Sequence, residues 1–277
     1  MQSVVFFGSF QNFSTLTLQK LINSKLFTIN AVITTPPKPA NHGVITKTHT
    51  HLFCEANNIP VYPLVNLDII PETIQKPDFI LVSGYGKIIP DNWLNFPKIM
   101  AINAHQSLLP NYAGRFPAQW AILNGEIETG VTLIKMSAKF DKGNILAQSK
   151  INILPTDTSE TLYTKLYNLS ASLFIDIAPK INKIIPIPQT GTGFYARQLT
   201  KDDGYVTNFD NLDRKIRALN PWPGVWTYVT DKNNRKLILK IISIKNNIPD
   251  IVLIEGKKPT QWQEISQYYT LTNKPKD

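Results

Sequence analysis

The stretch DFILVSGYG, Asp78 to Gly86, contains four consecutive apolar residues and ends at glycines. A short apolar run of this kind is typical of a strand that is buried on both faces of a sheet. Four further strand-like runs flank it in the sequence, at residues 3–9, 27–35, 59–64 and 99–105. Helical patterns at residues 13–24 and 49–58 separate these runs. The alternation predicts an α/β fold with a Rossmann-like, mostly parallel sheet and helices on both faces.

The C-terminal part of the chain has a different pattern. Beyond residue 120 come two more strand-like runs and a long helical pattern, at residues 130–137, 144–153 and 158–181. The stretch IIPIPQTGTG, residues 184–193, is rich in Pro, Gly and Thr and is the best candidate for a linker. Short strand-like runs follow it around one helical piece, at residues 205–209, 224–230 and 236–244. We therefore predict a large domain over residues 1–188 and a small β-rich domain over residues 189–277.

The composition limits the class of protein. The 277-residue chain has a formal net charge of +9 and one cysteine, Cys54, which forms no internal disulfide and fits a reducing compartment. The N-terminus lacks the basic region of a signal peptide, and no apolar run approaches the roughly 18 residues that span a bilayer. We expect a cytoplasmic protein without membrane contact. The last 87 residues hold 14 basic and 9 acidic side chains, an excess that indicates a polyanionic partner or, equally well, ordinary solvated lysines.

Polar side chains that are able to take part in catalysis occur where the predicted strand IMAINAH ends. Asn103 and His105 are two residues apart, so they point to the same face, at the edge of an α/β sheet where ligands bind. An amide and an imidazole together can donate hydrogen bonds to a developing oxyanion, and an imidazole can move a proton. Asp141, in KFDKGNI, is a candidate partner that would fix the tautomer of the ring. Taken alone, an Asn-x-His triplet is more often a core histidine beside a turn-forming asparagine.

Three motifs together resemble the formyltransferases that use 10-formyltetrahydrofolate. They are NAHQSLLPNYAG from Asn103, GEIETGVTLIKM from Gly125 and FDKGNIL from Phe140. The resemblance implies that Asn103, His105 and Asp141 are catalytic, that 10-formyltetrahydrofolate is the formyl donor and that no metal takes part. It also implies two sets of folate-binding residues, one in the SLLP loop and one in the pterin pocket: Ser107, Leu108, Leu109, Pro110, Gly84, Tyr85, Gly86 and Ile88. Phosphate-binding glycine loops and zinc-type Cys/His spacings do not occur in the sequence.

The C-terminal part is similar to that of family members that act on initiator methionyl-tRNA. The similarity lies in residues 194–229 and in LIEGKKPTQWQEI, residues 253–265. It implies a monomeric enzyme of translation initiation whose OB-like domain, here a strand or two short, holds the tRNA. The basic residues that we expect to contact tRNA phosphates are Lys38, Lys47, Arg214, Lys215, Arg217, Lys257 and Lys258.

Two alternatives stay open at this point. Asn111 and Ala113 replace arginines that are usual in the tRNA-dependent members, and Arg115 with Phe116 resembles enzymes that formylate the 4-amino group of a nucleotide sugar. The acceptor could therefore be an amino sugar. An RNA-binding protein on an inactive α/β scaffold is the non-enzymatic alternative, and the presence of all three candidate catalytic residues argues against it.

Overall fold

The computed structural model describes residues 1–39 and 44–273, which form two compact units. The first unit contains residues 1–117, 128–152 and 163–196, and the second contains residues 118–127, 153–162 and those from 197 onward. Contacts thus group the chain in a different way from the single boundary expected at residue 188. That boundary stays a prediction about which parts fold independently.

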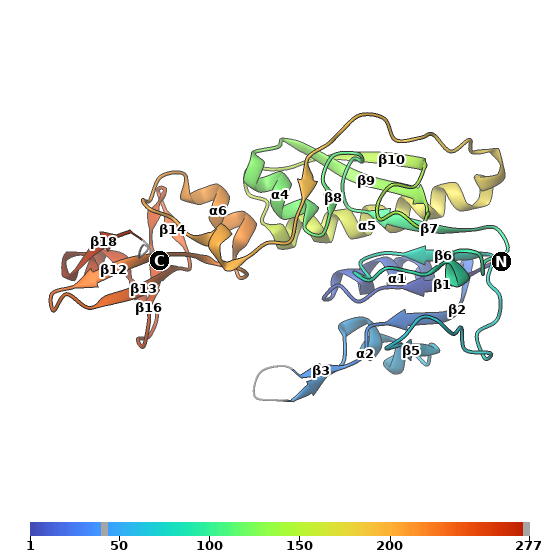
Figure 1. Cartoon of the computed structure of the whole chain (residues 1–277), viewed down its shortest axis with the longest axis horizontal. Helices are drawn as coiled ribbons and strands as arrows, with labels where there is room; N and C mark the ends of the chain where they lie inside the picture. The colour runs from blue at the N-terminus through green and yellow to red at the C-terminus, as the bar shows by residue number, and fades with distance from the viewer. Residues whose placement is uncertain (40–43, 274–277) are drawn as a thin grey trace. The chain divides into compact units, whose positions relative to one another are not determined.

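A seven-stranded sheet forms the centre of the first unit, running from top to bottom in Figure 1. In spatial order its strands are β10 (Ile145–Asn152), β9 (Glu128–Lys135), β7 (Met100–His105), β6 (Phe79–Val82), β1 (Gln2–Phe7), β2 (Phe27–Thr34) and β5 (Val61–Pro63). The last five are parallel to one another, and β9 is antiparallel to both of its neighbours, β7 and β10. The prediction of a mostly parallel sheet is confirmed.

Helical segments cover both faces of this sheet. They are α1 (Phe13–Asn23), α2 (His49–Ala56), α3 (Asp91–Leu94), α5 (Ser159–Ile177, of which the part from Tyr163 onward belongs to this unit) and the 3-10 helix Ala178–Lys183. Phe7 of β1 packs edge-on against Trp93 of α3, with ring centroids 5.0 Å apart. Phe79 of β6, which points to the opposite face, packs against Phe174 of α5 at 5.5 Å. The buried strands therefore hold their carboxyl ends at one edge of a sheet that is rigid on both sides.

Two pairs of very short strands complete the first unit. One pair joins β3 (Lys38–Pro39) and β4 (Ile45–Thr46). The other joins β8 (Ala113–Gly114) to β11 (Tyr195–Ala196) in parallel, which brings the residues just after the expected linker onto the loop that follows β7.

The second unit is built on a five-stranded antiparallel sheet. Its order is β17 (Thr260–Gln261), β16 (Ile251–Ile254), β13 (Lys236–Ile241), β12 (Val225–Asp231) and β18 (Tyr269–Thr272). The remaining elements are α4 (Pro117–Asn124, apart from its first residue), α6 (Leu212–Leu219), α7 (Trp262–Ile265), the pair β14 (Ile244–Lys245) and β15 (Ile248–Pro249), and the 3-10 helices Lys201–Gly204 and Ser266–Tyr268. The predicted β-rich character is confirmed.

One local prediction in this unit is wrong. Residues 205–209 do not form a strand: only Tyr205 pairs, in a single bridge with Trp226. The Asn208 side chain accepts a hydrogen bond from the Asp210 amide at 3.1 Å, a local turn that competes with strand pairing. Among the residues described, no helix has both the length and the hydropathy that crossing a membrane requires.

Candidate active site

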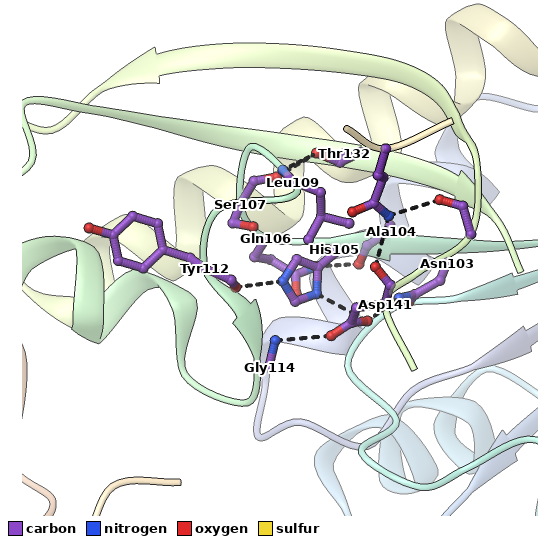
Figure 2. A network of polar contacts seen from close by, with 12 residues as sticks. Asn103, Ala104, His105, Gln106, Ser107, Leu109, Tyr112, Gly114, Thr132 and Asp141 are labelled. Atoms are coloured by element: carbon purple, nitrogen blue, oxygen red, sulfur yellow. Dashed lines mark hydrogen bonds and ion pairs between the residues drawn. The ribbon is translucent and has the colours of Figure 1, made fainter. Parts of the chain in front are cut away.

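The structure brings the three predicted catalytic residues together (Figure 2). Asn103 and His105 lie at the carboxyl end of β7, and Asp141 lies in the loop between β9 and β10. The Asn103 side-chain amide donates to Oδ1 of Asp141 at 3.2 Å. The same oxygen is 3.6 Å from Nδ1 of His105, an ion-pair distance that is too long for a hydrogen bond. One carboxylate oxygen thus faces both the amide and the ring.

The second carboxylate oxygen of Asp141 is held by the backbone. Oδ2 accepts a hydrogen bond from the Gly114 amide at 3.0 Å, and the Asp141 side chain is only 2% exposed. A charge buried to this degree is stable only when its oxygens have partners. Gly114 can occupy this position between Asp141 and β11 because it has no Cβ. Its φ is 121°, and a Cβ would overlap the carbonyl of Ala196 in β11.

The ring of His105 is fixed from its other side. Nε2 lies 2.9 Å from the carbonyl oxygen of Tyr112. A dashed line marks this contact in Figure 2. Because a carbonyl only accepts, Nε2 must carry a hydrogen and donate it. Nδ1 then faces the Asp141 carboxylate at an ion-pair distance, and this carboxylate can balance the charge of a ring that is protonated at both nitrogens. A protonated His105 ring held in this way can stabilise negative charge that develops on a substrate atom beside it.

The SLLP loop is tied to the antiparallel strands. Thr132 of β9 donates to the Ser107 carbonyl at 2.6 Å and accepts from the Leu109 amide at 3.0 Å. Gln148 of β10 donates to the Leu109 carbonyl at 2.9 Å. These bonds fix the loop that leads to Tyr112, the anchor of His105. The cavity beside the catalytic trio is not lined by Ser107, Leu108, Leu109 or Pro110, and their contact with folate stays a prediction.

A cavity of about 360 Å³ borders the trio. Gly84, Tyr85, Gly86 and Ile88, the four residues expected at the pterin pocket, line it together with Asn103, His105 and Asp141. The Tyr85 hydroxyl is buried without a hydrogen-bond partner in the described part of the chain, and burial raises its pKa to about 12. It is therefore a neutral group that a ligand with a polar edge could satisfy.

The sequence did not reveal the aromatic wall of this cavity. The Phe10 ring lies 5.2 Å from Tyr163, 6.1 Å from Tyr167 and 6.4 Å from Phe116, and all four residues line the cavity. The spacing of Tyr163 and Tyr167, four residues apart in a helical pattern, could have indicated a shared face. Nothing local could have brought Phe10 and Phe116 to that face.

The predicted tRNA contacts differ in their surroundings. Arg217 pairs with Asp213 at 2.8 Å and donates to the Asp157 carbonyl, and Lys215 donates to the Tyr205 carbonyl at 3.3 Å while desolvation lowers its pKa. The partners of these two side chains all lie in the second unit, so Lys215 and Arg217 stabilise the fold of that unit.

The other five candidates are exposed, and two of them have ion-pair or hydrogen-bond partners. Lys47 pairs with Glu55 at 2.6 Å, and Lys257 donates to the Tyr269 hydroxyl at 2.7 Å. Lys38 lines the cavity, and Lys258 has no ion pair or hydrogen bond within the described ranges. The remaining candidate, Arg214, has its guanidinium against Gly125, where a Cβ would come within 2.7 Å of its Cζ. Among the residues described, the side chains of Lys38, Arg214 and Lys258 thus form no ion pair and no hydrogen bond.

Comparisons with known proteins found matches along most of the chain. Residues 1–177 match the family described as formyl transferase, and residues 199–263 match the formyl transferase C-terminal domain. The chain is 35% identical to a methionyl-tRNA formyltransferase of Ehrlichia chaffeensis, with 98% of each chain covered. It is 38% identical to that of Dictyoglomus thermophilum, covering 83% of this chain and 76% of the relative.

Solved structures share the fold. A 4-N formyltransferase from Francisella tularensis superposes with a TM-score of 0.63 at 20% identity, covering 86% of this chain and 96% of the other. An N-formyltransferase from Helicobacter canadensis, in complex with folinic acid and dTDP-3-aminofucose, gives a TM-score of 0.57 at 24% identity, covering 79% and 80% of the two chains. No group of three or more His, Cys, Asp or Glu side chains suited to a metal ion occurs in residues 1–39 and 44–273.

Proposed function

The chain belongs to the formyl transferase family, and on this premise we propose that it transfers the formyl group of 10-formyltetrahydrofolate to the α-amino group of initiator methionyl-tRNA. The observation that carries the acceptor is the similarity to methionyl-tRNA formyltransferases along nearly the whole chain, C-terminal unit included. In this reaction the neutral amine attacks the formyl carbon and N10 leaves with a proton. The products are formylmethionyl-tRNA, which serves translation initiation, and tetrahydrofolate.

We assign the stabilisation of the transition state to the catalytic trio. Attack converts the formyl oxygen into an oxyanion, which fixed donors stabilise. Asn103 has two amide hydrogens, of which Asp141 takes one and the oxyanion can take the other. The Nδ1 hydrogen of protonated His105 is not used up by Asp141 at 3.6 Å and can also reach the oxyanion. Asp141 orients the ring, balances its charge and helps to take the proton of the attacking amine.

The deciding experiment supplies a radiolabelled formyl donor with two acceptors side by side. Initiator methionyl-tRNA is expected to acquire the label, and the Asp141→Asn variant is expected to lose this transfer while still binding folate. Label on a 4-amino-sugar nucleotide and none on tRNA would assign the enzyme to the alternative function. The sequence feature that favours this alternative is Arg115 with Phe116, both of which line the cavity.

We further propose that the enzyme acts as a monomer in the cytoplasm, where charged tRNA and reduced folate are present. Light scattering after size-exclusion chromatography is expected to give a mass near 31.3 kDa. A mass of twice that value at micromolar concentration would contradict the monomer.

A further inference from the structure

The segment from Ile187 to Ala196, which we name the strap, runs along both loops that anchor the catalytic trio. At its start, Ile187 exchanges two backbone hydrogen bonds with Ile145, at 2.7 and 2.8 Å. At its end, the Phe194 carbonyl accepts from the Tyr112 amide at 2.7 Å, and the Ala196 carbonyl accepts from the Arg115 amide at 2.8 Å. The strap therefore supports the loop of Asp141 on one side and the loop of Tyr112 on the other.

Gln189 makes the central contact of the strap. Its side-chain Nε2 donates to two carbonyls of the same turn, that of Asp141 at 2.8 Å and that of Gly143 at 2.8 Å. The Oε1 atom is buried without a partner among the residues described. Rotating the amide by half a turn would point this oxygen at two carbonyl oxygens, so the two bonds fix the orientation of the amide.

The turn that Gln189 holds has a conformation that needs support. Asp141 has a φ of 53°, in the left-handed region that residues with a Cβ rarely adopt. Gly143 lies against β9 so closely that a Cβ would overlap the Lys135 carbonyl. The direction of the Asp141 carboxylate follows from the backbone of this turn. Contacts that hold the backbone therefore also hold the carboxylate toward His105 and Gly114.

We infer that Gln189 is a positioning residue for the formyl transfer, acting through Asp141. It does not line the cavity, and both hydrogen bonds that its side chain makes within the described residues go to backbone carbonyls of the turn. The inference rests on the proposed function, because it assigns Asp141 to the reaction. The two hydrogen bonds that Gln189 donates keep the Asp141 carboxylate in the reactive position.

The first test compares kinetics of Gln189 variants with those of a matched neighbour. Gln189→Leu removes both donors and is expected to lower kcat about 10- to 100-fold, with KM for donor and tRNA within about twofold of wild type. Gln189→Lys supplies an ammonium that can donate to both carbonyls and is expected to recover part of this loss. Thr190→Ala, at an exposed position beside it, is expected to behave as wild type. Wild-type kcat in Gln189→Leu, or equal losses in the Leu and Lys variants, would overturn the inference.

The second test asks whether the effect passes through Asp141. In an Asp141→Asn background, adding Gln189→Leu is expected to cost little further activity, since both changes disable one unit. A full additional loss would show that Gln189 acts elsewhere. Amide hydrogen exchange gives a readout without substrate: the Gly114 amide, which donates to Asp141, is expected to exchange faster in Gln189→Leu than in wild type. Unchanged exchange contradicts the inference, whereas a wild-type enzyme that formylates no methionyl-tRNA contradicts only the proposed function.

Discussion

Asn103 and Asp141, 38 residues apart in the sequence, share a hydrogen bond of 3.2 Å at the carboxyl end of β7. The oxygen that accepts it also faces His105, so a change in any one of the three residues alters the surroundings of the other two. The site behaves as a unit, and the losses caused by its single substitutions are not expected to add.

Removing either oxyanion donor is expected to lower kcat by about 10²–10³. This holds for Asn103→Ala and for His105→Ala, because each replaces a polar group beside the reacting oxygen by a methyl group. Folate affinity, measured by isothermal titration calorimetry, is expected to change little. Turnover near that of wild type in either variant would contradict the assignment of the site.

Asp141→Asn keeps the shape of the side chain and removes its charge. We expect kcat to fall by at least about 10², since an uncharged amide neither balances a protonated His105 nor takes a proton. Single-turnover kinetics with saturating donor separate this chemical defect from binding. A loss confined to KM would mean that Asp141 binds substrate and does not assist the transfer.

Gly114→Ala should reduce activity although residue 114 has no side chain. The added Cβ overlaps the Ala196 carbonyl, and the φ of 121° is strained for alanine, so the amide that supports Asp141 must move. Gly191→Ala is the control, because Gly191 has a φ of 79° and no atom within 4 Å of the added Cβ. The control is expected to lose only about 1 kcal/mol of stability. Equal activity of the two variants would argue against the role of the Gly114 amide.

Salt dependence tests the tRNA acceptor. A side chain that neutralises a phosphate releases a counterion, so KM for tRNA should rise steeply with salt. Lys258→Ala is expected to flatten this slope by about one unit with little change in kcat. Lys76→Ala, at an exposed lysine of the first unit without a predicted role, should leave the slope unchanged. A shallow slope in the wild-type enzyme would favour a nucleotide sugar, which carries only a diphosphate.

Stability should depend on pH through Asp78. Hydrogen bonds from the Ser3 backbone amide at 2.8 Å and from its hydroxyl, together with nearby Lys98, lower the pKa of Asp78. A lowered carboxyl pKa stabilises the fold above the unfolded-state pKa of about 3.9, and this contribution disappears as the pH falls through the folded-state pKa. Asp78→Asn should therefore cost on the order of 1 kcal/mol at pH 7. Urea unfolding is expected to show a smaller difference at pH 3.5, and a pH-independent difference would exclude the charge as its cause.

Local sequence patterns predicted much of the fold. The helix predicted at residues 212–219 is α6 (Leu212–Leu219), and the strand predicted at residues 27–35 differs from β2 by one residue. The spacing of apolar residues indicates which side of a helix or strand is buried. It therefore predicts an element correctly when residues within that element determine its conformation. It failed at residues 205–209, where a side chain of the segment itself closes a turn.

The sequence by itself determined the central sheet and the positions of Asn103 and His105, because two residues on one strand share a face whatever surrounds them. Only the tertiary structure decided what holds them. Gln189 donates to the Asp141 carbonyl, 48 residues away in the sequence, and Phe10 packs against Tyr163 in the wall of the cavity. Arg217 and Lys215 form hydrogen bonds within their own unit. Such contacts depend on how distant elements pack, and no periodicity within one segment encodes the partner that another segment supplies.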